Sequence, residues 1–217
     1  MPSSATDLIS DRAYAELRER IVTLRLAPGT VLREDELMSE LAIGRTPLRE
    51  AVKRLALENL VAVQPRSGTY VTSVDAADIV HISEVRVELE AHAAELATRR
   101  LDDLTRARFE ALLDRIASAA DGSDQDALMG LDEAIHHLIW DASGNPYLAD
   151  TLERYFILSL RIWYVVLDRL PSLGAAVLDH ARLIEAILAG DAPGARALMA
   201  EHVVAFEREI MAAFDSG

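Results

Sequence analysis

The chain has 217 residues, of which 51% are hydrophobic and 27% are charged, and its formal net charge is -14. A chain of this length and composition can bury a sizeable core in one or two domains. It contains no cysteine, which excludes disulfides and thiolate metal sites. The sequence shows neither a signal peptide nor a stretch long and apolar enough to span a membrane. We therefore expect a cytoplasmic protein with no membrane partner.

The negative charge is confined to the second part of the chain. Residues 1–72 contain ten basic and ten acidic residues, whereas residues 73–217 contain the remaining 12 basic and 26 acidic residues. Acidic surface favours solubility and keeps that part away from the phosphates of nucleic acid. The chain thus divides into an electrically neutral head and an acidic remainder. Any DNA-binding surface of the head must have its positive groups concentrated on one side.

The head begins with helical patterns. An amphipathic helix is expected over residues 15–24, followed by turn residues at 27–30, and a second helix over residues 34–42. Gly44 provides a short turn before a third helix, and Pro47 fits the first turn of that helix. On one side of the third helix lies an apolar stripe of Leu48, Ala51, Val52 and Leu55. The adjacent exposed stripe consists of Arg45, Thr46, Arg49 and Lys53.

A helix, a short glycine turn and a helix with cations at its start predict a helix-turn-helix, whose second helix can enter a DNA major groove. A basic helical face alone is more often an ordinary solvated surface. The following residues favour DNA binding, because the β-prone runs 60–64 and 68–72 flank Pro65-Arg66-Ser67 and predict a hairpin. Three helices and a hairpin form a winged helix-turn-helix, and Arg66 at the tip of the wing would lie near a phosphate or the minor groove.

Several motifs of the head occur together. They are Pro-Gly-Thr-Val-Leu at residues 28–32, Arg-Thr-Pro-Leu-Arg-Glu-Ala at 45–51 and Gly-Thr-Tyr-Val at 68–71, with Glu34, Leu37, Leu41 and Leu55. This first third of the chain resembles the GntR family of bacterial transcription regulators. The resemblance implies that Arg45, Thr46, Arg49 and Gly68 approach operator DNA. The family usually has Gly-Val-Ser before the first arginine, whereas this chain has Ala-Ile-Gly at residues 42–44. Gly44 can cap the helix but lacks the serine hydroxyl.

From residue 78 onward the sequence is almost entirely helical, with Ala, Leu, Arg and Glu dominating. Breaks are expected at residues 121–123, 143–146, 171–174 and 189–194. They separate six predicted helices, over residues 78–100, 102–120, 125–143, 147–170, 173–189 and 194–213. We therefore predict a mainly α protein, with a winged helix-turn-helix domain at residues 8–73 and an all-α antiparallel bundle at residues 78–215.

Four polar residues of the bundle fall within or beside apolar helix faces, where an unpaired polar group costs about 1–3 kcal/mol. They are Asp132, His136, His180 and His202. Asp132 and His136 are four residues apart and therefore neighbours on one helix face. Glu133 and His137, on the same helix, point away from its apolar face and are expected to meet solvent. A single inward histidine is usually a core residue bonded to a backbone carbonyl.

Three imidazoles and one carboxylate taken together suit a divalent metal, with zinc, nickel, iron and manganese as candidates. Asp132-x-x-x-His136, followed by Ser-Gly-Asn at residues 143–145 and then by His180 and His202, resembles the FCD effector-binding domain of the FadR subfamily. The resemblance implies that these four residues hold the metal, for which zinc is our prediction. In an octahedral site, four protein ligands leave open positions for water or an anionic effector.

Arg86 lies among the inward apolar residues of the first bundle helix, so its guanidinium needs an anion. From position alone, a ligand carboxylate and Glu90, one turn further along, are equally good partners. The resemblance, through the pattern Glu84-x-Arg86-x-x-x-Glu90, implies that Arg86 binds the carboxylate of a small organic acid. Asn145 resembles an effector-binding asparagine of the family, although it serves equally well as a turn residue or helix N-cap.

These expectations describe a DNA-binding transcription regulator, most often a repressor in this family, whose operator affinity is switched by a small carboxylate metabolite. A homodimer joined through the bundles would present two heads to a pseudo-palindromic operator. One alternative is a metal-dependent hydrolase fused to a DNA-binding head, but the only spare inward acid that could act as general base is Glu90. A helical interaction module with core histidines is a second alternative. We predict that the chain is not an enzyme.

Overall fold

The computed structural model describes residues 5–66, 68–119, 125–169 and 173–215. Contacts divide the chain into two compact units, the first formed by Met1–Asp75 with Ile157–Val165 and the second by Ala76–Phe156 with Val166–Gly217. The predicted breaks at 121–123 and 171–172, the predicted helix ends at 120 and 170, and Ser67 of the predicted turn lie outside the described residues. None of the described helices combines the length and apolarity that a membrane span requires.

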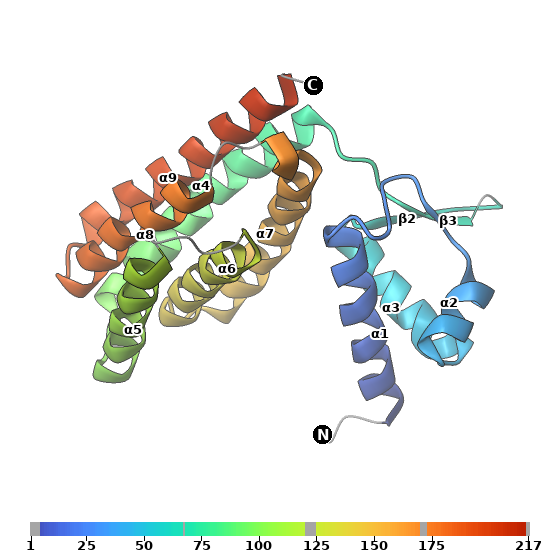
Figure 1. The fold of residues 1–217 in the computed structure, drawn as a ribbon. Helices are drawn as coiled ribbons and strands as arrows, with labels where there is room; N and C mark the ends of the chain where they lie inside the picture. Colours follow the sequence, from blue (N-terminus) through green and yellow to red (C-terminus); the bar gives the residue numbers. More distant parts are fainter. Residues whose placement is uncertain (1–4, 67, 120–124, 170–172, 216–217) are drawn as a thin grey trace. The chain divides into compact units, whose positions relative to one another are not determined.

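The first unit contains the helices α1 (Ala5–Val22), α2 (Glu34–Leu41) and α3 (Arg45–Leu57). The winged helix-turn-helix prediction is confirmed, and Figure 1 shows the helices in order along the chain. Helix α1 starts ten residues earlier than its apolar periodicity predicts. Leu8 and Ile9 are exposed in this first part, whereas Ser10 is buried, so apolar residues do not mark the core-facing side of its first turns.

The wing is a three-stranded antiparallel sheet in the order β1-β3-β2. Its strands are β1 (Val31–Leu32), β2 (Val61–Gln64) and β3 (Gly68–Val71). Strands β2 and β3 form the predicted hairpin, with Gln64 opposite Gly68. Strand β1 pairs with β3 and was not predicted, because two residues are too few to show an alternating pattern. Arg66 and Gly68 have φ angles of 68° and 109°, in the left-handed region that glycine tolerates best.

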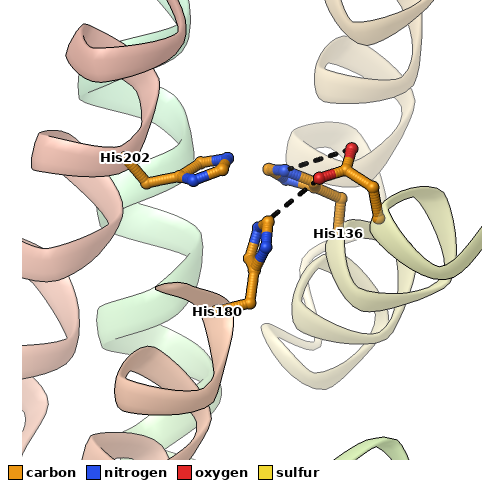
Figure 2. A group of neighbouring side chains, drawn as sticks. His136, His180 and His202 are labelled. Carbon is orange, nitrogen blue, oxygen red and sulfur yellow. Dashed lines mark ion pairs between the residues drawn. The ribbon is translucent and has the colours of Figure 1, made fainter. Parts of the chain in front are cut away.

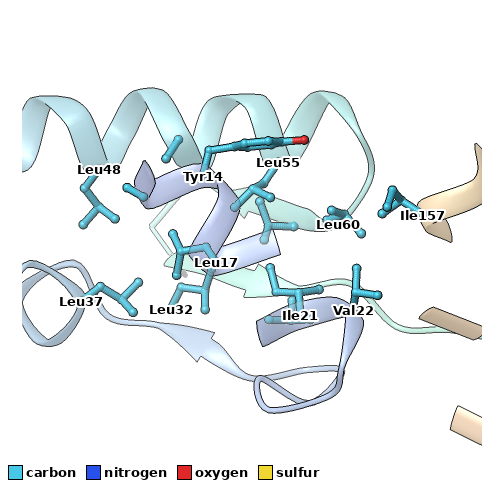
Figure 3. Packing of buried hydrophobic residues seen from close by; sticks show 14 residues of the cluster. Tyr14, Leu17, Ile21, Val22, Leu32, Leu37, Leu48, Leu55, Leu60 and Ile157 are labelled. Carbon is cyan, nitrogen blue, oxygen red and sulfur yellow. The ribbon is translucent and has the colours of Figure 1, made fainter. Parts of the chain in front are cut away.

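The core of the first unit forms where α1, α3 and the sheet meet (Figure 3). Leu17 and Ile21 of α1 and Leu48 and Leu55 of α3 are all fully buried. Ile157 also belongs to this core, in the part of the long helix α7 (Pro146–Val166) that counts with the first unit. Helix α3 carries the predicted DNA-reading residues, and close apolar packing against α1 and the sheet holds it in place.

Among its described residues, the second unit has helices as its only regular secondary structure, which confirms the predicted mainly α fold. Besides parts of α7 and the short 3-10 helix η1 (Leu167–Arg169), it contains α4 (Ala76–Arg99), α5 (Asp103–Ala119), α6 (Gln125–Ala142), α8 (Leu173–Leu188) and α9 (Ala192–Asp215). Helix α4 packs along α9 most extensively, and α8 contacts α4, α5, α6 and α9. This packing brings α6, α8 and α9, the three helices with inward histidines, into one bundle (Figure 1).

Candidate metal centre and DNA-reading helix

Four candidate metal ligands come together inside the bundle. Asp132 and His136 belong to α6, His180 to α8 and His202 to α9. Each offers one ligand atom, and these atoms all lie within 4.8 Å of one another. Figure 2 shows the three labelled imidazoles converging from their separate helices on one point. The residues that the helical periodicity singled out are thus the ones that the fold collects.

The distances within this cluster suit a single ion. The two oxygens of Asp132 lie 4.0 Å from His136 Nε2 and 3.8 Å from His180 Nε2, as the dashed lines of Figure 2 indicate. Bonds from zinc to nitrogen and oxygen are about 2.0–2.2 Å long, so two donors on one ion lie at most about 4.4 Å apart. The donor types and their grouping fit a metal ion, and the ligand atoms, which lie within 4.8 Å of one another, would move closer together to bind it.

The electrostatics of the cluster keep an imidazole ready to bind a cation. Burial, together with the neighbouring His180, His136 and Arg86, holds the pKa of His202 well below its ordinary value. The His202 ring is therefore neutral at pH 7, and one of its nitrogens carries the lone pair that a metal bond requires.

Glu90 of α4 lies directly behind the cluster and is fully buried. Its Oε1 accepts a hydrogen bond from Arg86 Nη2 at 2.9 Å, and its Oε2 accepts one from Trp140 Nε1 at 2.7 Å. The same Oε2 lies 3.3 Å from His136 Nδ1. Although burial alone would raise it, the pKa of Glu90 is lowered to about 2 by His136, Arg86 and the Trp140 hydrogen bond. Glu90 is therefore an ionised carboxylate at neutral pH.

Arg86 pairs with Glu90 but does not use all its donors there. Its side chain is only 5% exposed, and its Nε makes no hydrogen bond to any residue that the structure describes. The guanidinium carbon lies 5.4 Å from the centre of the Phe156 ring and 6.0 Å from that of Phe206. The ion pair between Arg86 and Glu90, one of the two alternatives that the sequence allowed, is thus present. The buried Nε–H of Arg86 still needs an acceptor.

Two other polar residues near the site have local partners. Asn145 is the N-cap of α7, and its side-chain oxygen accepts from the Leu148 N–H at 3.3 Å, so the capping role considered for it is present. His137 was expected to meet solvent, and its side chain is 39% exposed. It also has a partner that was not predicted, because its Nε2 lies 2.7 Å from Glu153 Oε2 of α7, and this carboxylate raises the pKa of His137.

The predicted DNA-reading residues lie on the exposed surface of the head. Gly44 is the N-cap of α3, as expected, with no side-chain hydrogen bond. Arg45 and Arg49 follow it on α3, with side chains 57% and 62% exposed. The remaining predicted contacts are also exposed: Thr46 and Lys53 on α3, and Arg66 and Gly68 on the wing.

Carboxylates at the start of α2 hold both arginines. Arg49 donates from Nε and Nη2 to the two oxygens of Glu34, at 2.9 and 3.2 Å. Arg45 Nη2 donates to Asp35 Oδ1 at 3.2 Å. These pairs were not predicted, because the partners are ten and fifteen residues apart and lie on different helices. Both exposed arginines of α3 are therefore paired with carboxylates of α2 in the free chain.

Comparison with known proteins settles the family. Residues 9–71 match the model of bacterial regulatory proteins of the gntR family, and residues 81–205, more than half of the chain, match the FCD domain. The chain belongs to the GntR family of transcription regulators with an FCD domain. It is therefore a DNA-binding regulator and not an enzyme, and the hydrolase alternative has no support.

Relatives of the family agree in sequence and in fold. The chain is 32% identical over 201 residues to the repressor GlaR of Escherichia coli (strain K12), covering 88% of this chain and 90% of GlaR. The structure of E. coli McbR superimposes with a TM-score of 0.80 at 23% identity, covering 96% of this chain and 98% of McbR. The Zn2+-bound FCD domain of TM0439 gives 0.52 at 22% identity, covering 67% of this chain and 99% of that domain.

Proposed function

We propose that this regulator is a repressor whose operator affinity changes when a small organic acid binds at a metal site in its bundle. One observation carries the proposal: a carboxylate and three imidazoles from α6, α8 and α9 place their ligand atoms within 4.8 Å of one another. Such a donor set in a mostly apolar interior is costly unless a cation satisfies it. Asp132, His136, His180 and His202 would hold that cation.

Zinc is the metal we propose first, because a solved FCD neighbour is Zn2+-bound. Imidazole and carboxylate donors also suit nickel, iron and manganese. When bound, the ion would supply a Lewis-acidic positive charge to which the carboxylate of an organic acid could bind. The role of the chain is to fix the donors and to exclude water with the surrounding apolar side chains, such as Phe156, whose ring centre lies 5.2 Å from that of His136.

Arg86 would bind the carboxylate of the organic acid. Its buried Nε–H has no acceptor, and an unsatisfied buried donor costs about 1–3 kcal/mol. A ligand carboxylate would satisfy that donor while Glu90 stays on Nη2, 2.9 Å away. Charge-assisted bonds of this kind are strong and directional. Asn145 was considered as a further ligand contact, but capping α7 already accounts for its side-chain oxygen.

In the head, Arg45, Thr46, Arg49 and Lys53 would enter the major groove, while Arg66 and Gly68 of the wing would approach the phosphate backbone. A homodimer would place two such heads on a pseudo-palindromic operator, since two-fold protein symmetry demands matching half-sites. Binding of the acid would change the position of the two heads relative to each other and thereby change the affinity of the dimer for the operator.

DNA reading is tested on an operator selected from random oligonucleotides. Arg45→Ala should weaken binding to that operator by about 10-fold to 100-fold, the range expected for loss of a base contact. Arg108→Ala, an exposed arginine of α5 that pairs loosely with Asp141 at 3.6 Å, is the matched control and should bind as wild type. Equal affinities for wild type and Arg45→Ala would contradict the groove assignment.

The switch is tested on the same operator, with zinc-loaded protein and a panel of mono-, di- and tricarboxylic acids. At least one acid should shift the wild-type affinity by about 5-fold or more, a typical allosteric coupling. Arg86→Lys keeps a cation for Glu90 but removes the Nε–H and the planar fork, so it should lose the response while binding DNA normally. No response to any acid, or an unchanged response in Arg86→Lys, would refute the switch.

A further inference from the structure

The hydrogen bonds around Glu90 determine which nitrogen of His136 carries a proton. Glu90 forms a buried ion pair with Arg86 at 2.9 Å, and a carboxylate in such a pair can only accept hydrogen bonds, whereas Trp Nε1 and the arginine nitrogens can only donate. Arg86 occupies Oε1 of Glu90 and Trp140 occupies Oε2, so the carboxylate is held from both sides. Its contact with His136 Nδ1, at 3.3 Å, must then be a hydrogen bond donated by the ring. His136 therefore carries its proton on Nδ1.

The opposite nitrogen of the same ring faces the candidate metal centre. His136 Nε2 lies 4.0 Å from Asp132 Oδ2, and the His136 ring centre lies 5.2 Å from that of His180 and 5.4 Å from that of His202. In a neutral imidazole with the proton on Nδ1, Nε2 carries the lone pair. The ring thus presents an acceptor to the cluster and a donor to Glu90.

We infer that Glu90 is a positioning residue, which holds His136 in the tautomer whose Nε2 lone pair faces Asp132, His180 and His202. The inference rests on the proposed function for the metal, but the tautomer itself is a property of the metal-free chain. Carboxylates that accept the second ring N–H of a metal-binding histidine fix its orientation and strengthen it as a ligand. Because Glu90 also binds Arg86, one carboxylate orients both the ring proposed for the metal and the guanidinium proposed for the acid.

The neighbouring residue provides a matched comparison. His137 also has a carboxylate partner, with Nε2 2.7 Å from Glu153 Oε2, but this pair is partly exposed, at 39% and 31%. His137 is not among the four clustered ligands. Glu153→Gln therefore removes a carboxylate from the adjacent ring of the same helix without touching the bonds between Glu90 and His136.

The test is a long-range 1H–15N correlation spectrum of the histidine rings in the full chain without metal. In wild type, His136 should show the pattern of a ring protonated on Nδ1, assigned by its absence from the spectrum of His136→Asn. Glu90→Gln leaves one accepting oxygen for the three donors Arg86 Nη2, Trp140 Nε1 and His136 Nδ1. It should therefore lower the population of the His136 tautomer protonated on Nδ1. Glu153→Gln should leave it unchanged. If Glu90→Gln does not fold, Glu90→Asp withdraws the carboxylate from Nδ1 and should shift the tautomer in the same direction.

A second readout is the affinity for zinc, measured by competition with a chromogenic chelator. Glu90→Gln or Glu90→Asp should weaken zinc binding by about 10-fold to 100-fold, the effect usual for such outer partners, whereas Glu153→Gln should bind as wild type. A wild-type His136 protonated on Nε2, or a Glu90 variant with unchanged tautomer and affinity, would overturn the positioning role. Absence of zinc uptake by wild type would instead overturn the proposed function, so the two failures are distinguishable.

Discussion

Glutamate and arginine form a pair at 2.9 Å in each of the two units, in opposite surroundings. In the head, the side chains of Glu34 and Arg49 are 39% and 62% exposed. In the bundle, those of Glu90 and Arg86 are 0% and 5% exposed. Water screens the first pair, so separating it costs little. Separating the second would leave a charge buried without a partner, which is strongly unfavourable.

This difference matches what the proposed function requires of each unit. A recognition helix must release its arginines to DNA, and a solvent-exposed carboxylate can hold Arg49 in place until a phosphate or base replaces it. A ligand site must keep its groups fixed before the ligand arrives, and the buried network of Glu90, Arg86, Trp140 and His136 does so. The comparison implies that equivalent substitutions in the two units should differ greatly in their effects.

The largest difference should appear in stability. Glu90→Ala leaves Arg86 buried and unpaired and removes the acceptor of Trp140, so it should lower the free energy of unfolding by about 3–5 kcal/mol. Glu34→Ala, its counterpart in the head, should leave that free energy nearly unchanged. Urea unfolding followed by circular dichroism measures both. Similar midpoints for the two variants would break the comparison.

The buried pair should also respond to acid. The folded pKa of Glu90, about 2, lies below the value of about 4.3 in an unfolded chain. Its contribution is therefore fully present above about pH 4.3 and is lost as pH falls toward 2. Glu90→Gln cannot titrate at this position, so the difference in unfolding free energy between wild type and Glu90→Gln should shrink below about pH 4.3. A difference that stays constant from pH 6 to pH 3 would contradict this assignment.

The exposed pair should act on DNA binding instead. Glu34→Gln frees Arg49 of its carboxylate, so binding to non-specific DNA should tighten. The slope of log K against log salt should become more negative by about one. Glu40→Gln is the control, because Glu40 lies on the same helix but pairs with Arg20 at 2.9 Å. Fluorescence anisotropy over a range of salt concentrations measures the slopes. Equal slopes for the two variants would show that Glu34 does not restrain Arg49.

The smallest effect concerns the turn of the helix-turn-helix. Ala42, where the family usually has glycine, has a φ angle of 52° at the C-terminus of α2. A side chain in this left-handed region is strained, whereas glycine adopts it freely. Ala42→Gly should therefore stabilise the head by about 0.5–1 kcal/mol, seen as a rise of a few degrees in melting temperature. A melting temperature that does not rise would contradict the assignment of backbone strain to Ala42.

The candidate metal ligands could be predicted because each departs from a regular pattern. Asp132, His136, His180 and His202 are polar residues on or beside apolar helix faces, and apolar faces of a bundle point toward a common core. Periodicity therefore placed all four toward a common core, and the resemblance to the FCD domain implied that they share one ion. The same reasoning identified Arg86, since a charge among inward residues needs a partner.

The partners of these residues could not be predicted in the same way. Trp140 reads as an ordinary apolar residue of α6, and its bond to Glu90 joins residues 50 apart in sequence. Arg161 of α7 is almost fully buried and donates to Thr72 Oγ1 at 2.7 Å, across a separation of 89 residues in the sequence. Such contacts depend on how helices cross in three dimensions, and sequence spacing along one helix carries no information about that.

The central claim is that the bundle holds one metal ion whose presence the acid response requires. The direct measurement is calorimetric titration of zinc into chelator-treated full-length protein, for wild type, His180→Ala and the control His92→Ala, whose exposed ring lies on α4 outside the cluster. We predict one zinc site per chain in wild type and His92→Ala, and its loss in His180→Ala. No binding by wild type, or equal binding by wild type and His180→Ala, would contradict the account.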